Sequence, residues 1–184
     1  MAIEIKTLTF DAYLALPEIK QRYEVIDGEL IYMSPAPTPE HQRLLRNLFR
    51  LLDQFVYTRD LGEVLFAPLD VLIRRDPLKT RQPDMLYISQ SRTEMIGPQL
   101  IEGGPDLAVE ILSPANTRSE LEEKLDDYWR IQVQECWLVS PEGMTIEVLR
   151  RGDQGYERTG LFGVGDLIRS EVLPAFRLRV EDIR

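Results

Sequence analysis

The sequence predicts an α/β protein built on a mixed β-sheet, and three observations lead to that fold class. Two stretches, 39–59 and 117–131, repeat apolar residues at the spacing of an amphipathic helix. Several short apolar runs bounded by Gly, Pro or Asp are typical of strands. Helices and strands alternate along the chain with no internal repeat and no long linker. This order predicts one domain, residues 1–184, in which helices cover a central sheet.

The N-terminal third predicts a short helix, a hairpin and a long helix. Residues 8–20 read as a helix limited by Pro17. Asp27-Gly28 separates two alternating apolar runs, which is the strongest short-range hairpin signal. The proline-rich segment 34–39 ends this hairpin. Thr38 is then placed to cap the long helix, with Pro39 at its first position.

The long helix carries an apolar face and a basic stripe. Its apolar face holds Leu44, Leu45, Leu48, Leu51, Leu52 and Phe55. Arg43, Arg46 and Arg50 recur at intervals of three and four residues beside it. Such a stripe is either a solvated face or a rim that meets phosphates, and the pattern leaves both open.

The remainder of the chain predicts strands on both sides of one helix. Strands are expected within 62–73, 82–89 and 105–114, with loops at 74–81 and 90–104 between them. The helix 117–131 begins near Thr117 or Ser119. Further strands are expected within 135–141, 144–151, 155–162, 166–170 and 176–180.

Composition is that of an ordinary globular chain and narrows the function classes. The 184 residues are 43% hydrophobic and 29% charged, with a formal net charge of −9. No apolar run approaches the roughly 20 residues of a membrane span, and the N-terminus does not read as a secretory signal, so a cytoplasmic protein with no membrane partner is expected. The negative charge argues against broad nucleic-acid binding but not against a local basic groove. The single cysteine, Cys136, is interpreted as a buried hydrophobe.

Two carboxylates inside apolar strands are the most informative candidates for a site. Asp84 lies in RQPDMLYIS and Glu110 in PDLAVEILSP. Strand alternation allows both side chains to converge if the two strands are neighbours. A carboxylate is costly in an apolar strand unless a partner compensates it, and two carboxylates with waters suit Mg²⁺. The competing interpretation of Asp84 is a Pro-Asp turn.

Lys124, on the predicted helix 117–131, offers a cation near this pair. It stands beside Leu121, Leu125 and Tyr128 on the helix and so can reach toward the sheet. There it would stabilise charge developing on a phosphate. The alternative is an exposed lysine that pairs with acids on its own helix, such as Glu120.

The segments RYEVIDGELIYMSP, EHQRLLRNL, RQPDMLYIS, PDLAVEILSP, the helix with Lys124 and Tyr128, and ECWLVSP follow one another in this order. Together they closely resemble the Uma-two (Uma2) family of restriction-endonuclease-like domains, in the P-D-(D/E)-x-K nuclease superfamily, over roughly residues 10–180. The resemblance implies a restriction-endonuclease-like core with a central mixed sheet flanked by helices, and a homodimer. It also implies Asp84 and Glu110 as ligands of Mg²⁺, for which Mn²⁺ can substitute.

The resemblance assigns further site residues to this chain. The superfamily's usual lysine position, two residues after the second acid, is Leu112 here, and the family instead places the lysine at Lys124. Glu29 in GEL is implied as a third acid, with a solvent-facing hairpin acid as the alternative. His41, the only histidine, is implied as an assisting residue, with a structural role as the alternative.

Three functions use these residues. The first is a Mg²⁺-dependent endonuclease that acts on nucleic acid, DNA more than RNA. The second is a catalytically inactive nuclease fold that serves as a binding or scaffold module, which the acidic net charge favours. The third is a metal hydrolase of a small phosphorylated molecule. The basic cluster Arg74, Arg75, Lys79 and Arg81 slightly favours a polymer backbone, unless it is a solvated turn.

Overall fold

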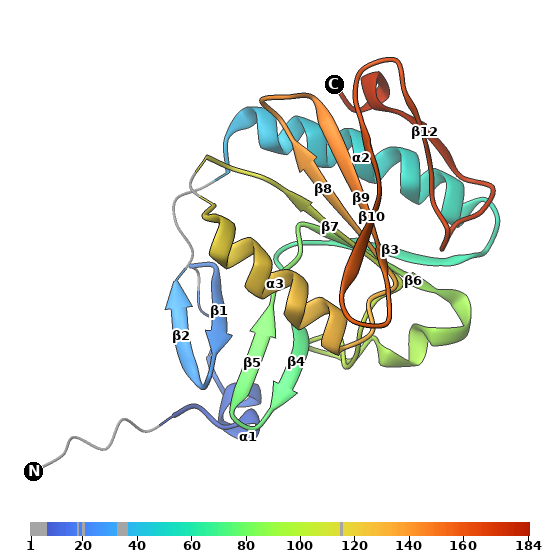
Figure 1. Ribbon diagram of the computed structural model, residues 1–184. Coiled ribbons are helices and arrows are strands. Elements are labelled where there is room, and N and C mark those ends of the chain that lie inside the picture. The colour runs from blue at the N-terminus through green and yellow to red at the C-terminus, as the bar shows by residue number, and fades with distance from the viewer. Residues whose placement is uncertain (1–6, 18, 20, 33–36, 115) are drawn as a thin grey trace, which may run out of the picture.

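A six-stranded mixed sheet forms the centre of the protein (Figure 1). The structure, a computed structural model, describes residues 7–17, 19, 21–32, 37–114 and 116–184. The strand order is β10-β9-β8-β7-β6-β3. The strands are β3 (Gly62–Phe66), β6 (Met85–Ser89), β7 (Leu107–Ile111), β8 (Glu135–Ser140), β9 (Thr145–Arg151) and β10 (Tyr156–Phe162). This confirms the predicted α/β class.

One connection in this sheet is parallel and the others are antiparallel. β7 and β8 pair in parallel, and helix α3 (Arg118–Arg130) joins them across one face of the sheet (Figure 1). A parallel pair requires such a crossover, whereas the antiparallel pairs need only turns. The crossover brings α3 over β7, the strand that carries Glu110. The predicted helix 117–131 is confirmed, and Thr117 caps it through a reciprocal pair of hydrogen bonds with Glu120.

Helix α2 (Pro39–Tyr57) covers the opposite face and confirms the predicted long helix. The Thr38 side chain accepts a hydrogen bond from the backbone N–H of His41, and Pro39 stands in the first turn. The buried side of the helix consists of Leu44, Leu45, Leu48, Leu52 and Val56. The basic stripe at positions 43, 46 and 50 is exposed on the outward side. Its placement favours the solvated-face interpretation.

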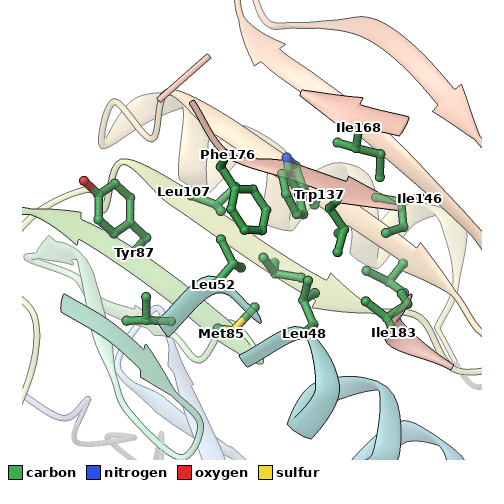
Figure 2. Packing of buried hydrophobic residues seen from close by; sticks show 14 of the residues in the cluster. Leu48, Leu52, Met85, Tyr87, Leu107, Trp137, Ile146, Ile168, Phe176 and Ile183 are labelled. Atoms are coloured by element: carbon green, nitrogen blue, oxygen red, sulfur yellow. The ribbon is translucent and has the colours of Figure 1, made fainter. Parts of the chain in front are cut away.

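The main apolar core lies between α2 and the sheet. Figure 2 shows Leu48 and Leu52 of α2 directed at Met85, Leu107 and Trp137 of the strands. A C-terminal segment completes the core beside α2. It comprises β11 (Leu167–Arg169), β12 (Arg177–Arg179) and the short 3-10 helix η2 (Val180–Ile183).

The core under α3 is smaller. Tyr128 packs there against Ala108, Cys136 and Leu138, and Cys136 is 2% exposed. The interpretation of Cys136 as a buried hydrophobe is therefore confirmed.

The N-terminal part forms a short helix and a separate hairpin. Helix α1 spans Phe10–Leu14, shorter than the predicted 8–20, and residues 18 and 20 of that range lie outside the described residues. The hairpin of β1 (Tyr23–Ile26) and β2 (Glu29–Tyr32) turns at Asp27 and Gly28, both with positive φ. The predicted hairpin turn is confirmed, whereas residues 34–36 of the proline-rich segment lie outside the described residues.

The prediction for residues 62–81 is wrong in detail. The expected single strand 62–73 divides into β3 and β4 (Val71–Arg75), and the expected loop 74–81 contains β5 (Leu78–Arg81), which pairs with β4 as a hairpin. All four residues of β5 are buried. The sequence did not indicate β5 as a strand, because its buried Lys79 and Arg81 interrupt the alternation of apolar and polar residues that identifies strands. The expected loop 90–104 likewise contains a 3-10 helix, η1 (Gln90–Met95).

Candidate active site

The Asp84 carboxylate lies where α2, β6 and β7 meet. The antiparallel register of β6 and β7 places Asp84 one step beyond the paired residues, opposite Glu110. Its Oδ2 atom accepts a hydrogen bond of 2.8 Å from the backbone N–H of Ile111 and lies 3.3 Å from Nε2 of His41. Asp84 is 7% exposed. The strand register thus brings the two predicted acids together, and the start of α2 adds the histidine.

Glu110 points from β7 toward α3, where two side chains hold its carboxylate. Nζ of Lys124 lies 3.1 Å from Oε1 and 3.0 Å from Oε2 of Glu110. The hydroxyl of Tyr128 donates a hydrogen bond of 2.5 Å to Oε1. Lys124 and Tyr128 are four residues apart and therefore share a face of α3. Lys124 thus reaches the sheet from its helix, as predicted, and does not lie on an exposed face.

The pKa values of the two acids are shifted in opposite directions. Burial disfavours ionisation of Asp84, but the His41 ring, the Ile111 N–H and the charge of Lys124 outweigh burial and hold the pKa of Asp84 below its usual value. Burial is the largest influence on Glu110, and the neighbouring Asp84 adds to it. Lys124 offsets these effects only in part, so the pKa of Glu110 is raised.

Lys124 is a stable cation in spite of its burial. Burial lowers the pKa of its ammonium, but Glu110, Glu24 and Asp84 together raise that pKa above the usual value. An ammonium of this kind stays charged at neutral pH. The site therefore contains a fixed positive charge beside two carboxylates of different basicity.

Comparison with known proteins identifies the family of this chain. Residues 10–181 match the Uma2 family, whose description is "Putative restriction endonuclease". The chain belongs to the Uma2 family. The resemblance of its motifs is therefore confirmed across almost the whole length of the chain.

A solved structure supports the fold of this Uma2 protein. A crystal structure of a "putative nuclease belonging to DUF820" from Anabaena variabilis superposes with a TM-score of 0.76. The two sequences are 22% identical, and the match covers 96% of this chain and 97% of the other. No curated protein matches the chain in sequence. In the described part of the Uma2 chain, no helix is long and apolar enough to cross a membrane.

A third acid, Glu24, lies near Lys124, whereas the family resemblance had implied Glu29. Glu29 is exposed at the turn end of β2, opposite Ile26, and no hydrogen bond or ion pair among the described residues joins it to either predicted acid. Glu24 of β1 is 6% exposed, and its Oε1 lies 3.6 Å from Nζ of Lys124. The sequence did carry a signal for Glu24. It is a carboxylate between Tyr23 and Val25 in an apolar strand, the same criterion that selected Glu110.

The basic cluster at 74–81 faces acids of the protein itself. The Arg81 guanidinium donates to Glu24 at 2.9 Å, to Asp127 at 2.7 Å and to Glu123 at 2.8 Å. Lys79 lies 2.8 Å from both Glu123 and Asp127. The two other arginines of the cluster pair with Asp27 and Glu102. The cluster therefore gives no support to a polymer substrate, contrary to the sequence interpretation.

The ion pairs join into one network that contains more acids than cations. We define this network as five carboxylates (Asp84, Glu110, Glu24, Asp127 and Glu123) and three cations (Lys124, Arg81 and Lys79). The carboxylates outnumber these cations by two, while His41 lies beside Asp84 and the Glu123 side chain is half-exposed. Every carboxylate of the network has a donor in the resting state. A divalent cation beside Asp84 and Glu110 would add positive charge to an acid-rich site.

The donor set of the acid pair fits a hard cation in type. Mg²⁺ is usually held by one or two carboxylates together with waters and substrate phosphates. Within the described residues, no hydrogen bond reaches Oδ1 of Asp84, so this oxygen is available to a cation. The same residues contain no cluster of three or more His, Cys, Asp or Glu side chains that could hold a metal. Nδ1 of His41 is buried with no hydrogen-bond partner among those residues. The pair can therefore supply two oxygen ligands, with waters and substrate completing the shell.

Proposed function

We propose that this Uma2 protein is a Mg²⁺-dependent endonuclease, also active with Mn²⁺, that hydrolyses phosphodiester bonds of DNA. The observation that carries the proposal is the closeness of three buried groups: Asp84 directly before β6, Glu110 of β7 and Lys124 of α3. Family membership supports the reaction class. The closeness of two buried carboxylates, Asp84 and Glu110, supports a divalent cation.

Each residue has a role that follows from its position. Oδ1 of Asp84 and the Glu110 carboxylate would hold the cation, which supplies an activated water and screens the phosphate charge when bound. Lys124, charged and aimed at the same point, would stabilise the negative charge that develops on the phosphate. His41 would fix the orientation of Asp84 through the contact between Nε2 and Oδ2.

Replacement of one acid tests this function directly. Asp84→Ala should reduce cleavage of plasmid and linear DNA to background in Mg²⁺ and in Mn²⁺, because it removes one of the two cation ligands. Glu29→Gln is the matched control, since Glu29 is an exposed acid of the β1–β2 hairpin with no hydrogen bond or ion pair to Asp84 or Glu110 among the described residues, and it should cleave like the unmodified protein. Cleavage that persists unchanged in Asp84→Ala would refute the proposed endonuclease site. An RNA substrate in the same assay tests the preference for DNA.

A non-catalytic binding module is the second candidate, and one observation favours it. Both oxygens of Glu110 already accept hydrogen bonds, from Lys124 and Tyr128, so the carboxylate is satisfied without a metal. Calorimetry with Mn²⁺ separates the two candidates. An absence of binding, together with an unchanged melting temperature, would support the binding module.

Two other predictions are open to test. Sedimentation would test whether the protein is a homodimer, and a substrate panel would test action on a small phosphorylated molecule.

A further inference from the structure

The Glu110 carboxylate has little capacity left for a cation while Lys124 occupies it. An ionised carboxylate offers about four lone-pair positions. Lys124 contacts both oxygens and the Tyr128 hydroxyl donates to Oε1, which engages three of them. A divalent cation at the remaining position would share Oε2 with an ammonium, and the two positive charges repel each other. Metal binding and the Lys124–Glu110 contact are therefore in competition.

Glu24 is prepared to receive the displaced ammonium. Its Oε2 accepts from Arg81 at 2.9 Å, and its Oε1 accepts from the backbone N–H of Gln82 at 3.0 Å. These two donors fix the carboxylate in a buried position. Nζ of Lys124 lies 3.6 Å from Oε1 of Glu24, just outside the range of a direct hydrogen bond.

We propose that Lys124 moves from Glu110 to Glu24 when a divalent cation binds the acid pair, and that Glu24 is the residue that positions it there. The proposal rests on the proposed function. The required movement is small, because a hydrogen bond of roughly 2.9 Å needs an approach of less than about 1 Å. The lysine side chain can supply it by rotation, while Arg81 holds Glu24 against α3 through Asp127. Lys124 remains beside the cation and keeps its charge available to a phosphate.

Glu24 is better suited to this role than to that of a third metal ligand. Each Glu24 oxygen already accepts from a fixed donor, Arg81 or the backbone of Gln82, and Nζ of Lys124 is the cation that lies 3.6 Å from Oε1. Accepting the ammonium of Lys124 uses a free position on Oε1 and disturbs neither contact. The resting and metal-bound states then differ by the transfer of one cation between two carboxylates, and every buried charge keeps a partner in both.

A double-mutant cycle measured by Mn²⁺ calorimetry tests the transfer, with melting temperatures recorded for every variant. Glu24→Gln should weaken Mn²⁺ binding about tenfold, because Lys124 loses its alternative partner and stays on Glu110. Lys124→Met should tighten Mn²⁺ binding, since the competitor is gone, although cleavage is lost. In the Lys124→Met background Glu24→Gln should have no further effect on affinity. Lys124→Gln, also neutral and able to hydrogen-bond Glu110, replaces Lys124→Met if the latter does not fold.

Glu123→Gln is the matched control for the lost charge. Glu123 also accepts from Arg81, but its side chain is half-exposed and makes no hydrogen bond or ion pair with Lys124 among the described residues. Its replacement should leave Mn²⁺ affinity near that of the unmodified protein. Equal losses in Glu24→Gln and Glu123→Gln would indicate a general charge effect and overturn the transfer. A Glu24→Gln penalty of the same size with and without the lysine would overturn it as well.

Asp84→Asn separates failure of the transfer from failure of the proposed function. Loss of Mn²⁺ binding in Asp84→Asn, combined with a Glu24→Gln penalty that does not depend on Lys124, would refute the transfer alone. Mn²⁺ binding that survives Asp84→Asn would refute the metal site, and the transfer with it.

Discussion

The two faces of the central sheet are stabilised in different ways. The face covered by α2 and the C-terminal segment is an apolar core with Leu48, Leu52 and Trp137 fully buried. Among its described buried residues, Glu135 contributes a carboxylate, which accepts from the Trp137 indole and the Glu171 backbone. The face covered by α3 contains a smaller apolar cluster and the network of five carboxylates and three cations.

One face of the sheet therefore supplies most of the stability, and the other face holds the candidate site. Burial of apolar area is non-directional and tolerant, so the α2 face stabilises the fold without constraining the site. Buried ion pairs contribute little net stability, but each member becomes indispensable once its partners are buried with it. Buried charges lower the stability of the α3 face. The proposed chemistry requires charged groups at this face.

Arg81→Met should have the largest effect on stability. It leaves the buried Glu24 and Asp127 without their shared partner, and the loss of one member of a buried pair costs about 3–5 kcal/mol. Urea unfolding followed by circular dichroism measures this loss. Mn²⁺ affinity should fall in parallel, because Glu24 is no longer held.

The control is Arg74→Met, another arginine of the same hairpin. Arg74 pairs with Asp27, but the two side chains are 43% and 64% exposed. An exposed pair contributes about 0–1 kcal/mol, so this variant should unfold close to the unmodified protein. If Arg81→Met and Arg74→Met lose the same stability, burial does not determine how much these ion pairs contribute to folding.

The contrast between the faces also explains what the sequence could predict. α2 was predicted with its cap and most of its buried side, because its apolar residues follow the helical period. Four of the six predicted face residues are buried, whereas Leu51 and Phe55 are only partly buried and Val56 was not expected. β5 was not predicted, because Lys79 and Arg81 are buried only through ion pairs with acids on α3 and β1, which are distant in sequence. Periodicity identifies elements that bury apolar groups, and it misses elements that bury charges paired across long distances.

The same reasoning applies to the site. Asp84 and Glu110 could be found because each is a carboxylate at an apolar strand, and Lys124 because its helix face is fixed by the helical period. Glu24 and Glu29 stand on opposite strands of one hairpin, and the family resemblance implied Glu29. Only the packing of β1 against β5 shows that Glu24 is the acid near Lys124.

Leu48→Ala should have the next largest effect and should act on the other face. Leu48 is completely buried in the α2 core, and such a truncation costs about 2–5 kcal/mol through lost burial and a residual cavity. Mn²⁺ affinity of the folded protein should not change, because Leu48 belongs to the apolar cluster under α2, which contains no member of the network. Urea unfolding and calorimetry of the same sample give both quantities. A large loss of Mn²⁺ affinity would show that the two faces are coupled.

The pH dependence of stability should show the smallest effect, and it compares the two acids directly. The pKa of Asp84 is lowered in the folded protein, so its contribution is present above the unfolded value of 3.8 and is lost as pH falls through the folded pKa. The pKa of Glu110 is raised from 4.5, so its contribution is present below that value and is lost as pH rises through the folded pKa. In urea unfolding with a chelator, Asp84→Asn should flatten the acid limb of the stability profile. Glu110→Gln should instead remove a decline that begins above pH 4.5. If both variants change the same limb, the two carboxylates do not differ in basicity as their surroundings indicate.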